Sequence, residues 1–100
     1  MSNVKVVTIS GSMRFAEKMM EVAEELELKG FAVIQCTYDV SGRKYKKSDI
    51  ETLRRTHNKK IEISDALYVV NVGGYIGSST KSEIEYARSL NKEILSLEPL

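Results

Sequence analysis

The chain has 100 residues, of which 42% are hydrophobic and 29% are charged, and its formal net charge is +1 at pH 7. This length suits one domain over residues 1–100, and the composition is ordinary for a globular protein. A net charge this small gives no strong signal for a nucleic acid or an anionic membrane as the main partner. Cys36 is the only cysteine, so no internal disulfide and no cysteine zinc site is possible.

The apolar runs of the chain are too short for a membrane span, the longest uninterrupted one being Ala66–Val70. We therefore expect no membrane partner and a cytoplasmic location, which a reduced Cys36 fits. We also expect no cofactor and no metal.

Four β-rich runs alternate with three helical patterns. The runs that predict strands are Val4–Ile9, Phe31–Cys36, Ala66–Val72 and Glu93–Leu97. The first three are nearly continuous apolar runs, which is typical of parallel strands covered on both faces. Apolar residues at three- and four-residue spacing predict helices over Phe15–Lys29, Ser48–Ile63 and Thr80–Leu90.

Signals at the ends of these elements support the assignment. Gly30 is a natural stop for the first helix, and Asn91 is expected to cap the third. Ser48 and Glu51 have the spacing of a capping box at the start of the second helix. The segment Thr37–Lys47 has no clear period, so we expect a polar loop there.

This alternation of strands and helices predicts an α/β fold with a doubly wound parallel sheet and helices on both faces. Right-handed crossovers favour the strand order 2-1-3-4. In such a sheet, ligands bind beyond the carboxyl ends of the strands at the point where the order reverses. The expected crevice therefore lies between the first and third strands.

Two loops rich in glycine and serine border that crevice, and both lead into helix N-termini. Backbone amides there, together with the helix dipole, favour an anion such as phosphate. Neither loop is a Walker A or a dinucleotide fingerprint. The candidate binding residues are Gly11, Ser12, Met13 and Arg14 after the first strand, and Asn71, Gly73, Gly74, Tyr75, Gly77, Ser79 and Thr80 after the third.

Structural alternatives stand beside these candidates. Gly11 and Ser12 are also explained by a turn that caps the first helix, and Arg14 by a solvated first-turn position. Cys36 fits a buried apolar thiol near the crevice. A basic flank of the second helix fits a solvated face or a phosphate-attracting one, and it consists of Arg54, Arg55, Lys59 and Lys60.

Glu83 and His57 are the candidate catalytic residues. Thr80 and Glu83 have capping-box spacing, so one interpretation is that the carboxylate reaches back to the Thr80 amide. The other is that Glu83, behind a glycine loop, faces the crevice, whereas Glu85 points to another face. His57 is the only histidine, and it suits either a packed helix position or an acid–base role.

Three stretches carry a resemblance to a known family. They are Ser10-Gly11-Ser12-Met13-Arg14, His57-x-x-Lys60-Ile61-x-x-Ser64-Asp65, and Asn71-Val72-Gly73-Gly74-Tyr75-Ile76-Gly77-x-Ser79-Thr80-x-x-Glu83-Ile84-x-Tyr86-Ala87. Together they resemble the nucleoside 2-deoxyribosyltransferase superfamily, most closely its short bacterial branch. That superfamily also includes the 2'-deoxynucleoside 5'-phosphate N-hydrolases. The resemblance covers nearly the whole chain except Thr37–Lys47 and implies a flavodoxin-like fold.

The resemblance implies that Glu83 attacks the anomeric carbon of a deoxyribose, giving a covalent intermediate that water or another base resolves. An acid must protonate the leaving base. Thr8 stands where the N-hydrolases carry a tyrosine, and His57 falls on or near their helix aspartate, so His57 is a candidate acid or phosphate ligand. Family members are often dimers or larger, so we expect a homo-oligomer.

The favoured function is therefore a protein that binds a nucleoside or nucleotide as its small-molecule partner. It would cleave or transfer the N-glycosidic bond of a 2'-deoxynucleoside or its 5'-monophosphate. The alternatives are a non-catalytic nucleotide-binding or sensing module, and an interaction protein on the same fold.

Overall fold

The structure is a computed structural model that describes residues 3–100. Short 3-10 turns follow the first and third strands at Met13–Phe15 and Val72–Gly74. The main elements in chain order are β1 (Val6–Gly11), α1 (Ala16–Leu28), β2 (Ala32–Ile34), α2 (Lys47–Ile63), β3 (Ala66–Val70), α3 (Ser78–Ser89) and β4 (Glu93–Ser96).

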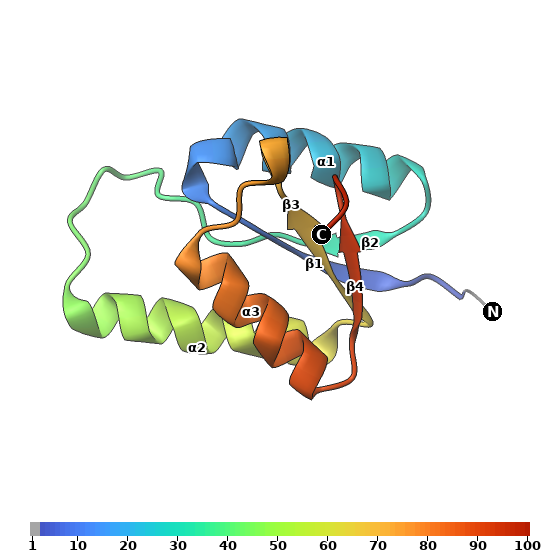
Figure 1. Cartoon of the computed structure of the whole chain (residues 1–100). Coiled ribbons are helices and arrows are strands. Elements are labelled where there is room, and N and C mark those ends of the chain that lie inside the picture. Colours follow the sequence, from blue (N-terminus) through green and yellow to red (C-terminus); the bar gives the residue numbers. More distant parts are fainter. Residues whose placement is uncertain (1–2) are drawn as a thin grey trace.

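The four strands form one parallel sheet in the order β2-β1-β3-β4, which confirms the predicted α/β, flavodoxin-like architecture. Helix α1 covers one face of the sheet, while α2 and α3 lie together on the other (Figure 1). Because each crossover contains a helix, the carboxyl ends of all four strands meet at one edge. That edge is where the site is expected.

Two apolar clusters hold the three layers together, one on each face. On the α1 face, Val7 and Ile9 of β1 pack with Met19 of α1. On the opposite face, Leu67 of β3 packs with Ile84 of α3. Within the described residues, no helix is long and apolar enough to cross a membrane.

The ends of the elements differ from the predicted ones by a few residues. Helix α2 begins at Lys47, and the carboxylate of Asp49 accepts a hydrogen bond from the Lys46 amide at 2.8 Å. The predicted capping box of Ser48 and Glu51 is therefore wrong, because the N-cap of the helix is Lys46, two residues before Ser48. Gly30 and Asn91 have φ values of 99° and 60°, as the predicted helix stops require.

The segment between β2 and α2 has no helix or strand, as the sequence predicted for a polar loop. Strand β2 is shorter than the predicted run from Phe31 to Cys36, since only Ala32–Ile34 pair with β1. The irregular segment therefore begins at Gln35 and places Cys36 and Thr37 at the carboxyl end of the sheet. Figure 1 shows this loop extending away from the body of the sheet before α2 begins.

Candidate functional site

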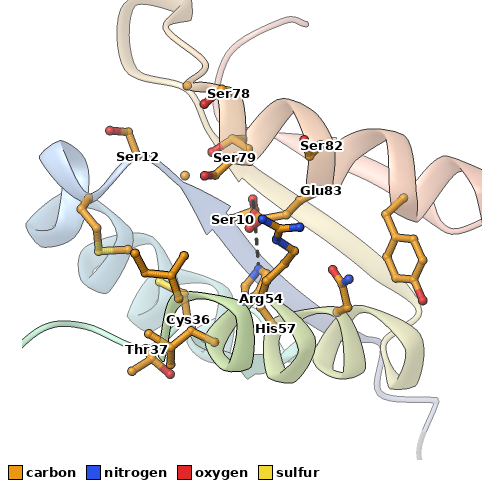
Figure 2. A pocket seen from close by; sticks show the side chains of 18 of the residues that line it. Ser10, Ser12, Cys36, Thr37, Arg54, His57, Ser78, Ser79, Ser82 and Glu83 are labelled. Carbon is orange, nitrogen blue, oxygen red and sulfur yellow. Dashed lines mark hydrogen bonds and ion pairs between the residues drawn. The ribbon is translucent and has the colours of Figure 1, made fainter. Parts of the chain in front are cut away.

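A pocket of about 750 Å³ lies at the carboxyl end of β1, between α2 and the first half of α3. Its floor is Ser10, at the end of β1, and its walls include His57 from α2 and Glu83 from α3 (Figure 2). The volume is within the usual range for small-molecule sites, about 300–1,000 Å³. The pocket thus occupies the switch-point edge that the sequence predicted.

Glu83 is the centre of a three-residue contact at the bottom of this pocket. Ser10 Oγ donates a hydrogen bond to Glu83 Oε1, and His57 Nε2 lies 3.4 Å from the same oxygen (Figure 2). The side chains of Glu83 and His57 are 23% and 11% exposed. Both contacts involve Oε1, which leaves Oε2 as the carboxylate oxygen available to a ligand.

His57 makes only this polar contact through its Nε2 atom. That nitrogen is buried and has no hydrogen-bond partner within residues 3–100. A buried polar atom without a partner is uncommon, because its lost hydration is not replaced. His57 therefore holds an unused hydrogen-bonding position beside Glu83, facing the pocket.

The position of Glu83 resolves the two interpretations of its spacing from Thr80. Gly77 is the N-cap of α3, so the helix begins at Ser78, two residues earlier than predicted. Thr80 is then a buried first-turn residue, and the Glu83 carboxylate turns to Ser10 instead of its own helix end. The capping-box interpretation is wrong because the actual cap lies at Gly77.

The pocket wall is rich in hydroxyl groups. Several come from the first turns of α3, where the backbone amides have no helical partners. Arg54 adds a cation, and Figure 2 shows its side chain extending from α2 toward α3. Such a wall suits a sugar or an anionic group. The Ser and Thr residues that line it are Ser10, Ser12, Thr37, Ser78, Ser79, Thr80 and Ser82.

The structure brings most of the predicted site residues to this pocket. The ones that line it are Gly11, Ser12, Met13, His57, Tyr75, Gly77, Ser79, Thr80 and Glu83. Gly11 also has a packing role, because a Cβ atom there would lie 3.0 Å from Met19 Sδ and 3.1 Å from the Val70 carbonyl oxygen. Ser12 caps the turn that follows, accepting a hydrogen bond from the Arg14 amide at 3.3 Å.

Four predicted binding residues do not line the pocket. The Arg14 guanidinium stacks 4.0 Å above the ring of Tyr75, at the pocket rim. Asn71 is fully buried, and its side-chain amide exchanges two 2.9 Å hydrogen bonds with the backbone of Glu98. The other two are Gly73 and Gly74, both with positive φ.

The glycine loop after β3 is occupied by the chain's own carboxylate. The amide of Gly73 donates a 2.8 Å hydrogen bond to Glu98 Oε2. The sequence suggested an anion at these glycines, and within the described residues Gly73 binds the carboxylate of Glu98, whereas the Gly74 amide donates to the Asn71 carbonyl oxygen. Asn71 and Gly73 therefore anchor the segment after β4 beside the loop that leads to Tyr75 and Gly77.

Thr8 and Ser10 are two residues apart on β1, so their side chains point to the same face of the sheet, but their contacts differ. Both side chains are on the α2–α3 face and fully buried, at 0% and 1% exposure. Thr8 Oγ1 donates to the Lys60 carbonyl oxygen at 3.1 Å and also hydrogen-bonds Ser64. Thr8 thus holds the end of α2 and does not line the pocket, whereas Ser10, two residues later, meets Glu83.

Sequence reasoning did not select several pocket residues as site candidates. Ser10 was inconspicuous within a Gly-Ser loop, and Arg54 was one of four basic residues on a flank. The usable signal was helical spacing, because Leu53 and Arg54 come four and three residues before His57 and each therefore lies next to it on the surface of α2. The other lining residues are Cys36, Thr37, Ile50, Asn58, Ser78, Ser82 and Tyr86.

The remaining members of the basic flank have separate contacts. Lys60 Nζ donates to the Gln35 carbonyl oxygen at 2.8 Å, and Lys59 lies 3.8 Å from Glu62. Cys36 is partly buried, and burial raises the pKa of its thiol, against the opposing effects of Tyr38 and Lys60. Among residues 3–100, no three His, Cys, Asp or Glu side chains are grouped as a metal site would need.

Comparisons with known proteins add no assignment. No protein-family model matches the chain, and no curated protein matches it either.

Proposed function

We propose that this pocket binds a nucleoside or nucleotide and that Glu83 cleaves or transfers the N-glycosidic bond of a 2'-deoxynucleoside or its 5'-monophosphate. The observation that carries the proposal is the orientation of Glu83. Its carboxylate turns away from its own helix end and into the pocket, beside Ser10 and His57. The motifs that resemble the nucleoside 2-deoxyribosyltransferase superfamily lend independent support, since they assign the same residue.

The chemistry follows from the two oxygens of that carboxylate. Ser10 and His57 hold Oε1, and Oε2 attacks C1' of the deoxyribose. The C1'–N bond breaks, its electron pair leaves with the base, and the base takes a proton from His57. Water, or the nitrogen of a second base, then attacks C1' and gives its proton to His57, and the C1'–O bond to Glu83 breaks to restore the carboxylate.

The pocket wall supports binding of the rest of such a substrate. Hydroxyl groups of Ser12 and Ser79 suit the sugar, and the amide groups at the start of α3 suit a 5'-phosphate. Arg54 supplies a positive charge on the opposite wall. The reaction needs no metal, because the carboxylate and the imidazole supply nucleophile and acid.

The test is release of free base from a panel of deoxynucleosides and their 5'-monophosphates, followed by chromatography. We expect release by the natural chain and a loss of roughly 10³-fold or more in Glu83→Gln. Glu85→Gln is the matched control, because Glu85 is an exposed carboxylate on the same helix that does not line the pocket. This control should release base at the natural rate.

The same panel separates catalysis from binding alone. A nucleotide that binds the folded chain at one hundred times its dissociation constant raises the free energy of unfolding by about 2.7 kcal/mol. Stabilisation of the natural chain without base release from any substrate contradicts the reaction and supports a non-catalytic binding module. Absence of both effects contradicts the proposed function altogether.

A further inference from the structure

The positive and negative charges are distributed unevenly along the chain, although its net charge is only +1. Residues 43–60 contain eight Lys or Arg and two Asp or Glu, a net charge of +6. The other residues contain seven Lys or Arg and twelve Asp or Glu, a net charge of −5. The positive charge is therefore concentrated on the end of the β2–α2 loop and the first four turns of α2, where the pocket opens.

A second groove, of about 380 Å³, lies beside this positive region. It is formed between the loop after β2 and the first turns of α2. Its apolar and aromatic surface comes from Tyr38, Val40, Tyr45 and Leu53, and its two charged residues are Arg43 and Asp49. Tyr45 is about one-third exposed and Val40 is almost fully exposed, so these surfaces are open to a ligand.

The groove adjoins the Glu83 pocket. Thr37 and Leu53 line both cavities, so the two are separated by no more than shared side chains. Arg54 lies on the Glu83 side of this boundary and Arg43 on the other. Within residues 3–100, neither guanidinium forms an ion pair with a carboxylate, which leaves both charges available to an anion.

We infer that the ligand is a dinucleotide, with one nucleotide in the Glu83 pocket and the base of the second on Tyr45 in the adjoining groove. This inference rests on the proposed function for the first nucleotide. A positive groove lined by aromatic rings binds successive bases by stacking and their linking phosphates by charge. A nucleoside polyphosphate lacks the second base, so it would leave Tyr45 and Val40 without a partner.

The linking phosphate has a matching place in this arrangement. It would lie at the boundary near Thr37 and Leu53, between Arg54 and Arg43, where the positive charge of residues 43–60 attracts it. The link can be a phosphodiester from the 3' oxygen, as in a DNA fragment, which leaves the 5'-phosphate of the first nucleotide at the start of α3. A 5'–5' pyrophosphate also places two bases around an anion, but it would bring the 5'-phosphate of the first nucleotide to this boundary instead.

The experiment compares affinities by calorimetry, using Glu83→Gln so that no ligand is consumed. The ligands are deoxyadenosine 5'-monophosphate, the phosphodiester-linked 5'-phosphorylated deoxyadenosine dinucleotide, and diadenosine diphosphate with its pyrophosphate bridge. We expect at least one dinucleotide to bind about ten-fold or more tightly than the mononucleotide at equal salt. The dinucleotide that binds more tightly than the mononucleotide shows whether the site prefers a phosphodiester or a pyrophosphate link.

Variants of residues in the second groove test whether the higher affinity for the dinucleotide depends on that groove. Tyr45→Ala should remove this gain while leaving mononucleotide affinity unchanged, and Tyr45→Phe should preserve it because the ring remains. Arg43→Ala should weaken the dinucleotide and flatten its salt dependence. Arg88→Ala is the matched charge control, since Arg88 is exposed on the last turn of α3 and lines neither groove.

The outcomes separate this inference from the proposed reaction. Equal affinities for mononucleotide and dinucleotides, or a gain that persists in Tyr45→Ala, overturn the inference even if base release occurs. A Tyr45-dependent gain without base release by the natural chain upholds the binding site and contradicts the reaction. If no nucleotide binds at all, both proposals are wrong.

Discussion

Ser10, at the carboxyl end of β1, donates a hydrogen bond to Glu83 on α3, 73 residues further along the chain. The hydroxyl is buried and reaches the same carboxylate oxygen that His57 Nε2 approaches. Rotation of the carboxylate would break the hydrogen bond from Ser10 and lose the 3.4 Å contact with His57 Nε2, so its freedom to rotate is limited. This relationship orients the other oxygen toward the pocket and motivates the first prediction.

Ser10→Ala should reduce base release about ten- to one-hundred-fold, since it removes a hydrogen bond to a charged group. The effect should appear in kcat rather than KM, because Ser10 positions Glu83 and leaves the hydroxyl-rich wall intact. Steady-state kinetics measure it. Ser89→Ala is the control, because Ser89 is an exposed serine on the same helix as Glu83 and does not line the pocket, so this variant should behave like the natural chain. Equal kinetics in Ser10→Ala would argue against a positioning role.

His57→Gln should lower base release by roughly 10²–10⁴-fold, the usual contribution of a general acid. The loss should shrink strongly with the 7-methylguanine deoxynucleotide, whose base is already cationic and leaves without a proton from the enzyme. Comparing the two substrates in both proteins measures this. An equal loss on both substrates would assign His57 to positioning of Glu83, through the 3.4 Å contact, rather than to proton transfer.

Thr8→Val should lower the free energy of unfolding by about 1–3 kcal/mol, because it leaves buried partners at Lys60 and Ser64 without the Thr8 hydroxyl. Urea denaturation measures the loss. Nucleotide affinity should be unchanged, since Thr8 does not line the pocket. Weakened nucleotide binding in a folded Thr8→Val protein would instead favour a sugar contact at this position, as the resembled N-hydrolases have with their tyrosine.

Gly11→Ala should destabilise the fold by roughly 1–3 kcal/mol, the usual cost of overpacking. Its Cβ would meet the Val70 carbonyl oxygen at 3.1 Å, and backbone at that distance cannot move aside cheaply. Gly77→Ala is the matched comparison, because its Cβ would make only an ordinary 3.7 Å contact with Tyr75 at a negative φ. Thermal denaturation should separate the two variants, with Gly77→Ala close to the natural chain.

Cys36 should react slowly with iodoacetamide at neutral pH, because burial raises the pKa of its thiol and so lowers the thiolate fraction. The rate should continue to increase at pH values above the ordinary thiol pKa of 9.0. A bound nucleotide should slow the reaction further, since Cys36 lines the Glu83 pocket. Alkylation followed by mass spectrometry across pH measures both effects. Rapid labelling at neutral pH would contradict the burial argument.

Local sequence patterns are enough to predict the architecture and the edge of the sheet at which the pocket lies. Continuous apolar runs identify parallel strands, and the helical periods between them require crossovers, so strand order and the carboxyl-end crevice follow from local patterns. Local patterns also predict Glu83 and His57 as site candidates. Glu83 is a carboxylate behind a glycine loop, and His57 is the single histidine, on the inward face of a helix. These features are local in the chain, which is why the sequence is enough to predict them.

The contacts of these side chains depend on packing between elements that are distant in the chain. Two competing interpretations of Glu83 differ by the two residues between Gly77 and the expected helix start, and local spacing does not resolve such a shift. The partner that turns the carboxylate is Ser10, which is distant in sequence and adjacent only because β1 and α3 pack together. Likewise, Gly73 binds Glu98 rather than lining the pocket, a pairing that no local pattern predicts.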